Sequence, residues 1–261
     1  MTFSEIGTTP NSPLFLKHTF TPQHVLELIY LDDSFIAVNK VAGLLAVPGR
    51  GADKQDCLAG RVQAEFSDAL VVHRLDMATS GLLLFARGVE MQRRLSQMFR
   101  EREIQKRYVA LVLGRIKSAN MQSAPSRNLT KNERGCSLLL PSGEGWEGGW
   151  SEIALPLIGD WPNRPKQKVD HESGKHSLTR YRSLINGADT GASRVELEAV
   201  TGRTHQLRVH MAAIGHPILG DALYNVETGV SAKRLMLHAC SLSFKHPLSG
   251  EPLSLTSDPP F

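Results

Sequence analysis

The segment Leu70-Val-Val-His-Arg-Leu-Asp-Met-Ala-Thr-Ser-Gly81 leads directly into the apolar run Leu82-Leu-Leu-Phe-Ala86. The apolar residues at its two ends are typical of short strands, and the polar residues between them are typical of a turn. This pattern predicts two strands that hold a polar turn rigidly, with Asp76 near the centre of the turn.

Asp76 has Arg74 on one side and Thr79-Ser-Gly81 on the other. A carboxylate at the edge of a core can be desolvated while a nearby cation keeps it ionised, which suits a nucleophile or a base. The other interpretation is that Asp76 caps the turn by accepting backbone N–H bonds, as Asp commonly does. From spacing alone, turn capping is the favoured interpretation.

Short strands outnumber helices in the rest of the pattern. Met91, Leu95 and Phe99 recur at helical spacing, which predicts an amphipathic helix over residues 88–103 with basic side chains on its outer face. Strands are expected at residues 26–31, 35–39, 108–113, 179–184, 194–199 and 237–244, and further helices near 57–66 and at 204–214. We therefore expect an α+β fold with a mixed, mostly antiparallel central sheet and flanking helices.

Two segments differ from this pattern. Residues 1–24 contain scattered Pro, Ser and Thr without a sustained period, and we expect a mobile extension. Residues 117–150 are rich in Ser, Asn, Gly and Pro, which predicts a long loop insertion. The expected organisation is a single domain over residues 25–261 that carries this insertion.

Composition excludes several classes of protein. The chain has 261 residues, of which 41% are apolar and 21% charged, as in a globular protein. It contains neither the run of about 18 apolar residues that a membrane span needs nor the pattern of a secretory signal. Cys57, Cys136 and Cys240 match neither a disulfide framework nor a zinc knuckle. We expect a cytoplasmic protein with no metal.

Basic residues are concentrated in one segment. The net charge is +4 and the isoelectric point is near 9.0, which leaves nucleic acid open as a partner. Between Arg87 and Arg107, seven basic residues stand against three acidic ones. This segment can supply a phosphate-facing surface, but for a charge run alone a solvated helix face is the favoured interpretation.

The usual catalytic signatures are missing. The sequence has no phosphate-binding loop of the Walker or Rossmann type, no G-x-S-x-G elbow, no H-E-x-x-H pair and no zinc deaminase signature. The sequence therefore shows no motif for nucleotide hydrolysis, dinucleotide redox chemistry or zinc-dependent deamination. What remains as a candidate reactive group is the carboxylate of Asp76.

Five further motifs accompany the Asp76 segment. Val72-His-Arg-Leu-Asp-Met-Ala-Thr-Ser-Gly81 resembles the H-R-L-D-x-x-T-S-G motif of the RluA family of RNA pseudouridine synthases. The other segments that resemble this family, in its order, are Asn39-Lys40 with Gly43-Leu44, Lys106-Arg-Tyr-Val-Ala110, Thr201-Gly-Arg-Thr-His-Gln-Leu-Arg-Val-His210, Gly215-His-Pro-Ile-Leu-Gly-Asp221 and Leu237-His-Ala239. Val41 departs from the Pro that the family usually has there, and the 117–150 insertion is longer than expected.

The resemblance implies the pseudouridine synthase fold, with a catalytic cleft and without a preceding S4-type RNA-binding domain. It also implies an isomerisation that needs no cofactor and no metal. The family's essential carboxylate maps to Asp76, which either attacks the ribose or base covalently or abstracts a ribose proton. Arg208 pairs with that carboxylate, and Tyr108 stacks on the uracil and lies where the C5 proton leaves. Leu237 and Ile218 are weaker candidates for an apolar wall under the base.

RNA is the partner that the resemblance implies. Asp160-Trp-Pro-Asn-Arg-Pro-Lys-Gln-Lys-Val169 is similar to the dual-specificity members, which modify a large-subunit rRNA hairpin and a tRNA anticodon stem-loop at uridine 746 of 23S rRNA and uridine 32 of tRNA. Arg74 resembles the residue that fills the space left by the flipped uridine. The other expected RNA contacts are His73, Arg164, Lys166, Lys168 and Arg203, and we expect a monomer.

Three alternatives stay open. A protein of the same fold without the chemistry would bind RNA only. A carboxylate glycosidase or nucleoside hydrolase needs a second acid, for which Asp221 is the candidate if folding brings it near Asp76. A synthase of this family that modifies another uridine is the third.

Overall fold

The computed structural model describes residues 26–116, 149–186, 191–224 and 232–261. The extension predicted at residues 1–24 lies outside these ranges, as do Cys136 and nearly all of the insertion predicted at residues 117–150. Within the described part, no helix is both long enough and apolar enough to cross a membrane.

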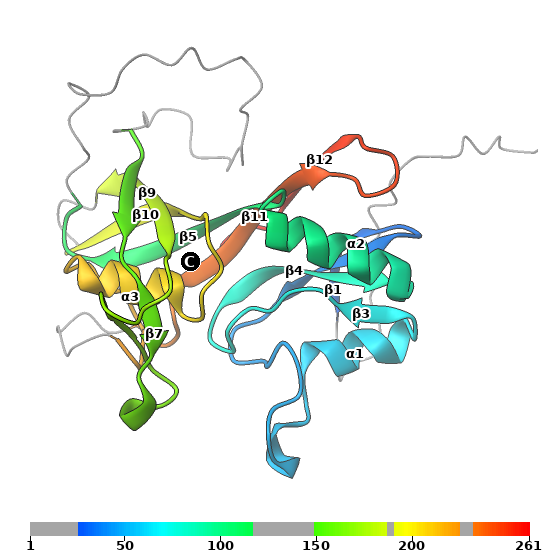
Figure 1. Ribbon diagram of the computed structural model, residues 1–261, viewed down its shortest axis with the longest axis horizontal. Helices are drawn as coiled ribbons and strands as arrows, with labels where there is room; N and C mark the ends of the chain where they lie inside the picture. Colours follow the sequence, from blue (N-terminus) through cyan, green and yellow to red (C-terminus); the bar gives the residue numbers. More distant parts are fainter. Residues whose placement is uncertain (1–25, 117–148, 187–190, 225–231) are drawn as a thin grey trace, which may run out of the picture.

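The N-terminal half consists of four strands and two helices (Figure 1). β4 (Ser80–Arg87) lies between β2 (Phe35–Lys40) and β3 (Ala69–Val71), and β2 also pairs with β1 (Glu27–Leu31), all antiparallel. α1 (Leu58–Glu65) and α2 (Gly88–Glu101) complete this half. These elements match the strands and helices that the sequence predicts here.

Both faces of the N-terminal sheet are covered, which explains the uninterrupted apolar run of β4. Val38 and Phe85 pack with α1, while Ala37 and Leu84, which alternate with them along the strands, pack with α2. A strand that is buried on both faces needs apolar residues at every position rather than at every second one. The polar turn before β4 is thereby anchored to two helices.

The C-terminal half contains α3 (Gln206–Ala213) and the strands β5 (Gln105–Leu113), β10 (Ala192–Ala199), β9 (Leu178–Asn186) and β6 (Ser151–Ala154), which pair in that order. β7 (Leu157–Gly159) and β8 (Gln167–Val169) form a separate hairpin with a short 3-10 turn, Trp161–Asn163, at its tip. β12 (Pro252–Thr256) pairs with β11 (Leu237–Lys245).

β11 joins the two halves into a ten-stranded sheet. It pairs with β5 on one edge and, through His238 and Ala239, with β4 on the other, and the β4 contact is the parallel one. Gly81 makes this junction possible: its φ is +114°, and a Cβ there would lie 2.3 Å from the carbonyl oxygen of Ala239. The predicted α+β fold with a mostly antiparallel sheet is confirmed.

Several boundaries differ from the sequence prediction. α2 ends at Glu101, and β5 begins at Gln105 rather than at Tyr108, so Lys106 and Arg107 lie on a strand and not on the basic helix. Arg107 forms an ion pair with buried Glu196, 3.1 Å away, and does not belong to a solvated helix face. The β7–β8 hairpin, β6 and β12 are additional elements.

Candidate active site

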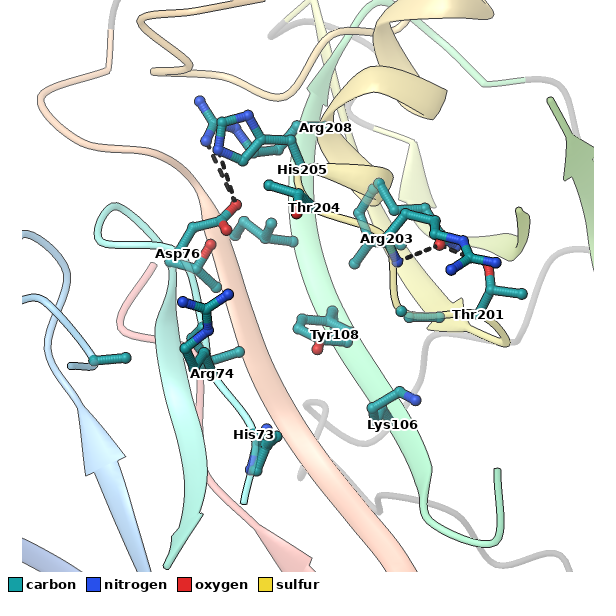
Figure 2. A pocket seen from close by; sticks show the side chains of 18 of the residues that line it. His73, Arg74, Asp76, Lys106, Tyr108, Thr201, Arg203, Thr204, His205 and Arg208 are labelled. Carbon is teal, nitrogen blue, oxygen red and sulfur yellow. Dashed lines mark hydrogen bonds and ion pairs between the residues drawn. The ribbon is translucent and has the colours of Figure 1, made fainter. Parts of the chain in front are cut away.

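A cleft of about 750 Å³ opens where the two halves meet (Figure 2). Its walls are the β3–β4 turn, the C-terminal end of α2, β5, and the segment from Ala199 to Arg208 that leads into α3. Among the described residues, the lining includes six Arg and Lys side chains but a single carboxylate, that of Asp76; the basic residues are Arg74, Arg100, Arg102, Lys106, Arg203 and Arg208. This arrangement suits a polyanionic ligand.

The β3–β4 turn presents Asp76 to the cleft. The Asp76 side chain is 28% exposed, and its Oδ2 lies 3.5 Å from Nη1 of Arg208 and 3.8 Å from Nε2 of His205. Among the described residues, no backbone N–H binds its carboxylate, so the turn-capping interpretation is wrong. Figure 2 shows that Asp76 instead points toward α3.

Lys40 anchors the β3–β4 turn through a hydrogen bond to the Met77 carbonyl. Its ammonium donates to the carbonyls of Val41, Leu44 and Met77 at 2.7–3.0 Å, and the residue is fully buried. Burial lowers the pKa of Lys40 to about 8, although the charge of Asp76 opposes this shift. The Asn39-Lys40 motif was a sequence signal for this residue, but its contact with the Asp76 turn was not predicted.

Arg208 is held by two carboxylates. It is 5% exposed, and its Nε and Nη2 each donate to Asp221 at 2.7 Å. Burial alone would lower the pKa of Arg208, but the hydrogen bonds with Asp221 outweigh it and raise the pKa. Because the Asp221 side chain is fully buried in this pair, it is not available as the second acid of a hydrolase.

Tyr108 lies on β5 in the wall of the cleft. Burial, together with the negative charge of Asp76, raises the pKa of its phenol. Tyr108 is therefore an uncharged phenol at neutral pH, with a ring available for stacking.

His73 lies in the cleft wall but has a structural contact. Its Nε2 accepts a hydrogen bond from the backbone N–H of Leu84 at 2.9 Å, and its ring stacks on Phe99 with the centroids 4.3 Å apart. Burial, aided by the charge of Lys106, lowers the pKa of His73 to about 3. The imidazole is neutral at pH 7 and accepts a hydrogen bond from β4. The RNA contact expected at His73 from the sequence stays a prediction.

We expect this histidine to make the protein acid-sensitive. A histidine in the unfolded chain has a pKa near 6.5, so between about pH 6.5 and pH 3 the unfolded state binds the proton and the folded state does not. Stability then falls as the pH falls through this window. His73→Gln keeps an acceptor for the Leu84 N–H and should flatten the curve of unfolding free energy against pH by up to about 1.4 kcal/mol per pH unit. Parallel curves for the two proteins would contradict this.

Arg74 and Arg203 also line the cleft. Arg74 is exposed and forms no hydrogen bond or ion pair with any described residue, so it is available to a ligand. Arg203 donates from its Nε to the carbonyl of His176 at 3.1 Å. Figure 2 shows Arg74 beside Asp76 and Arg203 across the cleft.

Arg164, Lys166 and Lys168 lie on the β7–β8 hairpin and do not line the cleft. The guanidinium of Arg164 stacks on the exposed ring of Trp161, 3.5 Å from its centroid. Lys168 pairs with Asp170 at 3.3 Å. The structure thus brings together six of the nine predicted residues and places these three on a separate surface.

Three cationic residues of the cleft, Arg100, Arg102 and Lys106, were not among the predicted site residues. They belong to the basic segment between Arg87 and Arg107 that the sequence singles out. The spacing of apolar residues along α2 could not show that the C-terminal end of this helix faces the cleft. His205 was also missed, although it stands in the motif that contains Arg208.

Comparisons with known proteins show the family to which the chain belongs. The RNA pseudouridylate synthase family profile matches residues 34–213. The dual-specificity RNA pseudouridine synthase RluA of Yersinia pestis is 43% identical over 90% of this chain and 99% of its own length. RluA of Escherichia coli K12 is 42% identical over 90% of this chain and 94% of its own length.

A solved structure shows the same fold. Human RNA pseudouridylate synthase domain containing 1 aligns with a TM-score of 0.67 and 27% identity, covering 93% of this chain and 87% of that chain. The matched family profile includes the Asp76 turn, β5 and all of α3. On these findings, the chain belongs to the RNA pseudouridylate synthase family and is an RluA-like isomerase that converts uridine to pseudouridine in RNA.

Proposed function

We propose that the chain isomerises uridines in two RNAs, a large-subunit rRNA hairpin and a tRNA anticodon stem-loop, at uridine 746 of 23S rRNA and uridine 32 of tRNA. The dual specificity named for the relatives at 42–43% identity supports this choice. We further propose that residues 25–261 act as one catalytic domain in a monomer. The observation that carries the proposal is a lone carboxylate, Asp76, ion-paired with Arg208 in a cleft lined by cations.

Asp76 is the proposed reactive group. Pseudouridine formation breaks the N1–C1′ bond, turns the uracil and joins C5 to C1′, so no atom is lost and nothing is oxidised. Arg208 lies within ion-pair reach of Asp76, with Nη1 3.5 Å from Oδ2, and is proposed to hold the carboxylate in place for the reaction. The carboxylate then either forms a covalent bond to the ribose or base or removes a ribose proton.

Tyr108 is proposed to stack on the target uracil. Stacking on an aromatic ring contributes about 1–3 kcal/mol per base. We further propose that its phenol, in the wall of the cleft, lies where the C5 proton leaves. Arg203, which also lines the cleft, is proposed to contact the RNA backbone.

Arg74 is proposed to occupy the place of the flipped nucleotide. The uridine must leave the stack at a cost of a few kcal/mol, and a planar guanidinium can stack and hydrogen-bond in the vacated space. We expect Arg74→Ala to lower the single-turnover rate at limiting RNA by about tenfold. Because this side chain is exposed, the unfolding free energy should change by less than about 0.5 kcal/mol. An unaltered rate at limiting RNA would contradict the space-filling role.

The β7–β8 hairpin is proposed as a second RNA contact outside the cleft. Each phosphate contact to a single strand steepens the log–log dependence of affinity on salt by about 0.7. Replacing Arg164, Lys166 and Lys168 together by Ala should therefore reduce the slope by about 2, measured by titration across a range of KCl concentrations. The control is Lys54→Ala with Lys245→Ala, two exposed lysines outside the cleft and the hairpin. Equal slopes in both variants would refute the contact.

Tritium release tests the proposed function. Transcripts of the rRNA hairpin and of the anticodon stem-loop, labelled at uridine C5, are incubated separately with the purified protein. Release from both RNAs is the expected result, and release from one alone would refute dual specificity. Binding without release would indicate an RNA-binding protein, and free uracil as the product would indicate hydrolysis instead of isomerisation.

A further inference from the structure

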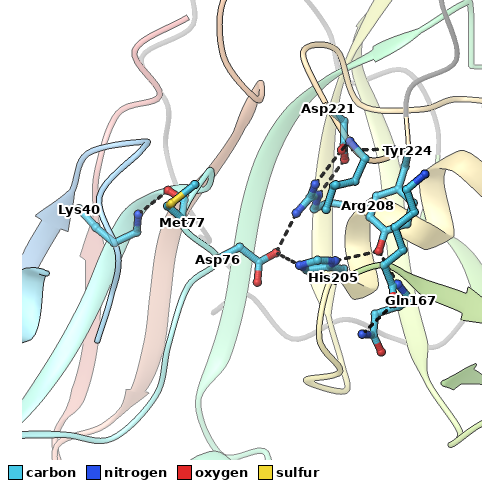
Figure 3. Close-up of polar contacts among 10 residues, drawn as sticks. Lys40, Asp76, Met77, Gln167, His205, Arg208, Asp221 and Tyr224 are labelled. Atoms are coloured by element: carbon cyan, nitrogen blue, oxygen red, sulfur yellow. Dashed lines mark hydrogen bonds and ion pairs between the residues drawn. The ribbon is translucent and has the colours of Figure 1, made fainter. Parts of the chain in front are cut away.

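Two hydrogen bonds and one longer polar contact connect the β7–β8 hairpin to the carboxylate of Asp76 (Figure 3). The backbone N–H of Gln167 donates to the hydroxyl of Tyr224 at 2.7 Å, and this hydroxyl lies 2.7 Å from Nδ1 of His205. On the other side of the same ring, Nε2 of His205 lies 3.8 Å from Oδ2 of Asp76. Four residues from four separate parts of the sequence are thus arranged in series.

The first donor of this series favours one direction for the bond that follows. A backbone N–H can only donate, so the Tyr224 oxygen is the acceptor for Gln167. Among the described residues, the Tyr224 hydroxyl proton has an acceptor only if Nδ1 of His205 carries no proton. In this arrangement the one proton of the neutral imidazole is on Nε2, the nitrogen that faces Asp76.

The same series opposes a second proton on His205. A protonated Nδ1 would have to donate to Tyr224, and the hydroxyl proton of Tyr224 would lose its acceptor. The groups that face the ring are Asp76 from the β3–β4 turn, Arg208 from α3, and Asp221 with Tyr224 from the segment after α3. Burial of the ring, with the charge of Arg208, lowers the pKa of His205 despite the two carboxylates.

The backbone of His205 is held in an unusual conformation. Its φ is +53° and its ψ is 16°, the left-handed region, and it stands immediately before α3. A non-glycine residue is uncommon in this region and persists there where the surroundings determine it. The side chain does not cap the helix. Its contacts are with Tyr224 and Asp76 instead.

We propose that His205, oriented by Tyr224, is a positioning residue that works with Arg208 to hold one oxygen of Asp76. Both partners make their closest approach to Oδ2, at 3.8 and 3.5 Å. Neither oxygen accepts a hydrogen bond from a described residue, so the two contacts to Oδ2 are what distinguishes it from Oδ1. In this proposal Oδ1 is the oxygen that reacts with the uridine. This inference rests on the proposed role of Asp76 as the reactive carboxylate.

Tyr224→Phe and His205→Gln test the proposal by single-turnover tritium release at saturating RNA, with affinity measured separately. We expect Tyr224→Phe, which removes only one oxygen, to lower the rate constant about 5- to 30-fold with the Kd within about twofold of wild type. His205→Gln retains an N–H donor and should lower the rate constant by a smaller factor, about 2- to 10-fold. The matched control is Tyr30→Phe, which removes a hydroxyl bonded to Asp32 at 2.8 Å, outside the cleft.

The pH profile separates positioning from a merely structural role. Without the Tyr224 hydroxyl, Nδ1 of His205 becomes free to take up a proton, and the cation would then bind the Asp76 carboxylate and reduce its reactivity. Tyr224→Phe should therefore show a rate that falls with decreasing pH between about 7 and 5, with an inflection that wild type, Tyr30→Phe and His205→Gln lack.

Each outcome has a definite meaning. If both variants keep wild-type rates and profiles, or if the whole loss appears in the Kd, the positioning role is refuted while the proposed function stands. If wild type releases no tritium, the proposed function fails. If Asp76→Asn remains active, the proposed role of Asp76 fails while the isomerase activity stands. This inference fails in both cases. The thermal unfolding temperatures of Tyr224→Phe and Tyr30→Phe are compared to find out whether Tyr224→Phe still folds. If it does not fold, the rate constant of His205→Gln decides whether the positioning role stands.

Discussion

Replacing Asp76 by Asn is expected to abolish the conversion of uridine to pseudouridine while RNA affinity stays within a few-fold of wild type. Asn has nearly the same size but can neither attack as an anion nor accept a proton. Positioned groups that transfer protons contribute about 10²–10⁴-fold to catalysis, so single-turnover tritium release should fall by at least about 10³-fold. Binding should persist because the cleft retains its six cationic side chains and loses its only carboxylate.

Asp33→Asn is the matched control for this prediction. Asp33 is fully exposed and lies outside the cleft, and its substitution makes the same chemical change. We expect wild-type rates from it. Turnover by Asp76→Asn at a rate comparable to that of Asp33→Asn would show that another group performs the reaction.

Replacing Arg208 by Met is expected to lower both activity and stability. Asp76 loses the guanidinium that lies 3.5 Å away and helps to orient its carboxylate. Removal of one such electrostatic partner typically lowers kcat by about 10²–10³-fold. The free energy of unfolding should also fall by about 3–5 kcal/mol, because buried Asp221 is left with an uncompensated charge.

A second substitution separates these two effects. In the double variant Arg208→Met with Asp221→Asn, no charge is left unpaired, and the Asn oxygen can still accept the backbone N–H groups of Leu223 and Tyr224 that Asp221 now binds. Urea unfolding should show that most of the stability returns, while single-turnover activity stays low. Recovery of activity together with stability would mean that Arg208 acts only through the fold.

The central elements of the fold could be predicted from the sequence because their periodicity has a direct physical cause. The apolar run of β4 reflects burial on both faces, and the spacing of Met91 and Leu95 reflects the single buried face of α2. The β7–β8 hairpin could not be predicted, because its strands have three residues each and are only partly buried. Strands that short carry almost no periodic signal.

The site was predictable only in part. Asp76, Tyr108 and Arg208 stand in motifs that resemble a known family, and folding brings all three to one cleft. The contacts that set their chemistry are long-range. The Asp221 pair with Arg208 and the Tyr224 bond to His205 depend on how the segment after α3 folds back, and no local spacing encodes it.

Pseudouridine mapping in RNA from cells that lack the gene tests the whole account most directly. The cells are complemented with wild type, with Asp76→Asn or with an empty vector, and total rRNA and tRNA are sequenced after pseudouridine-specific chemical treatment. Wild type alone should restore pseudouridine at the rRNA and tRNA sites that the deletion loses. Identical maps in all three strains, or restoration by Asp76→Asn, would contradict the assignment of this carboxylate as the group that isomerises uridine.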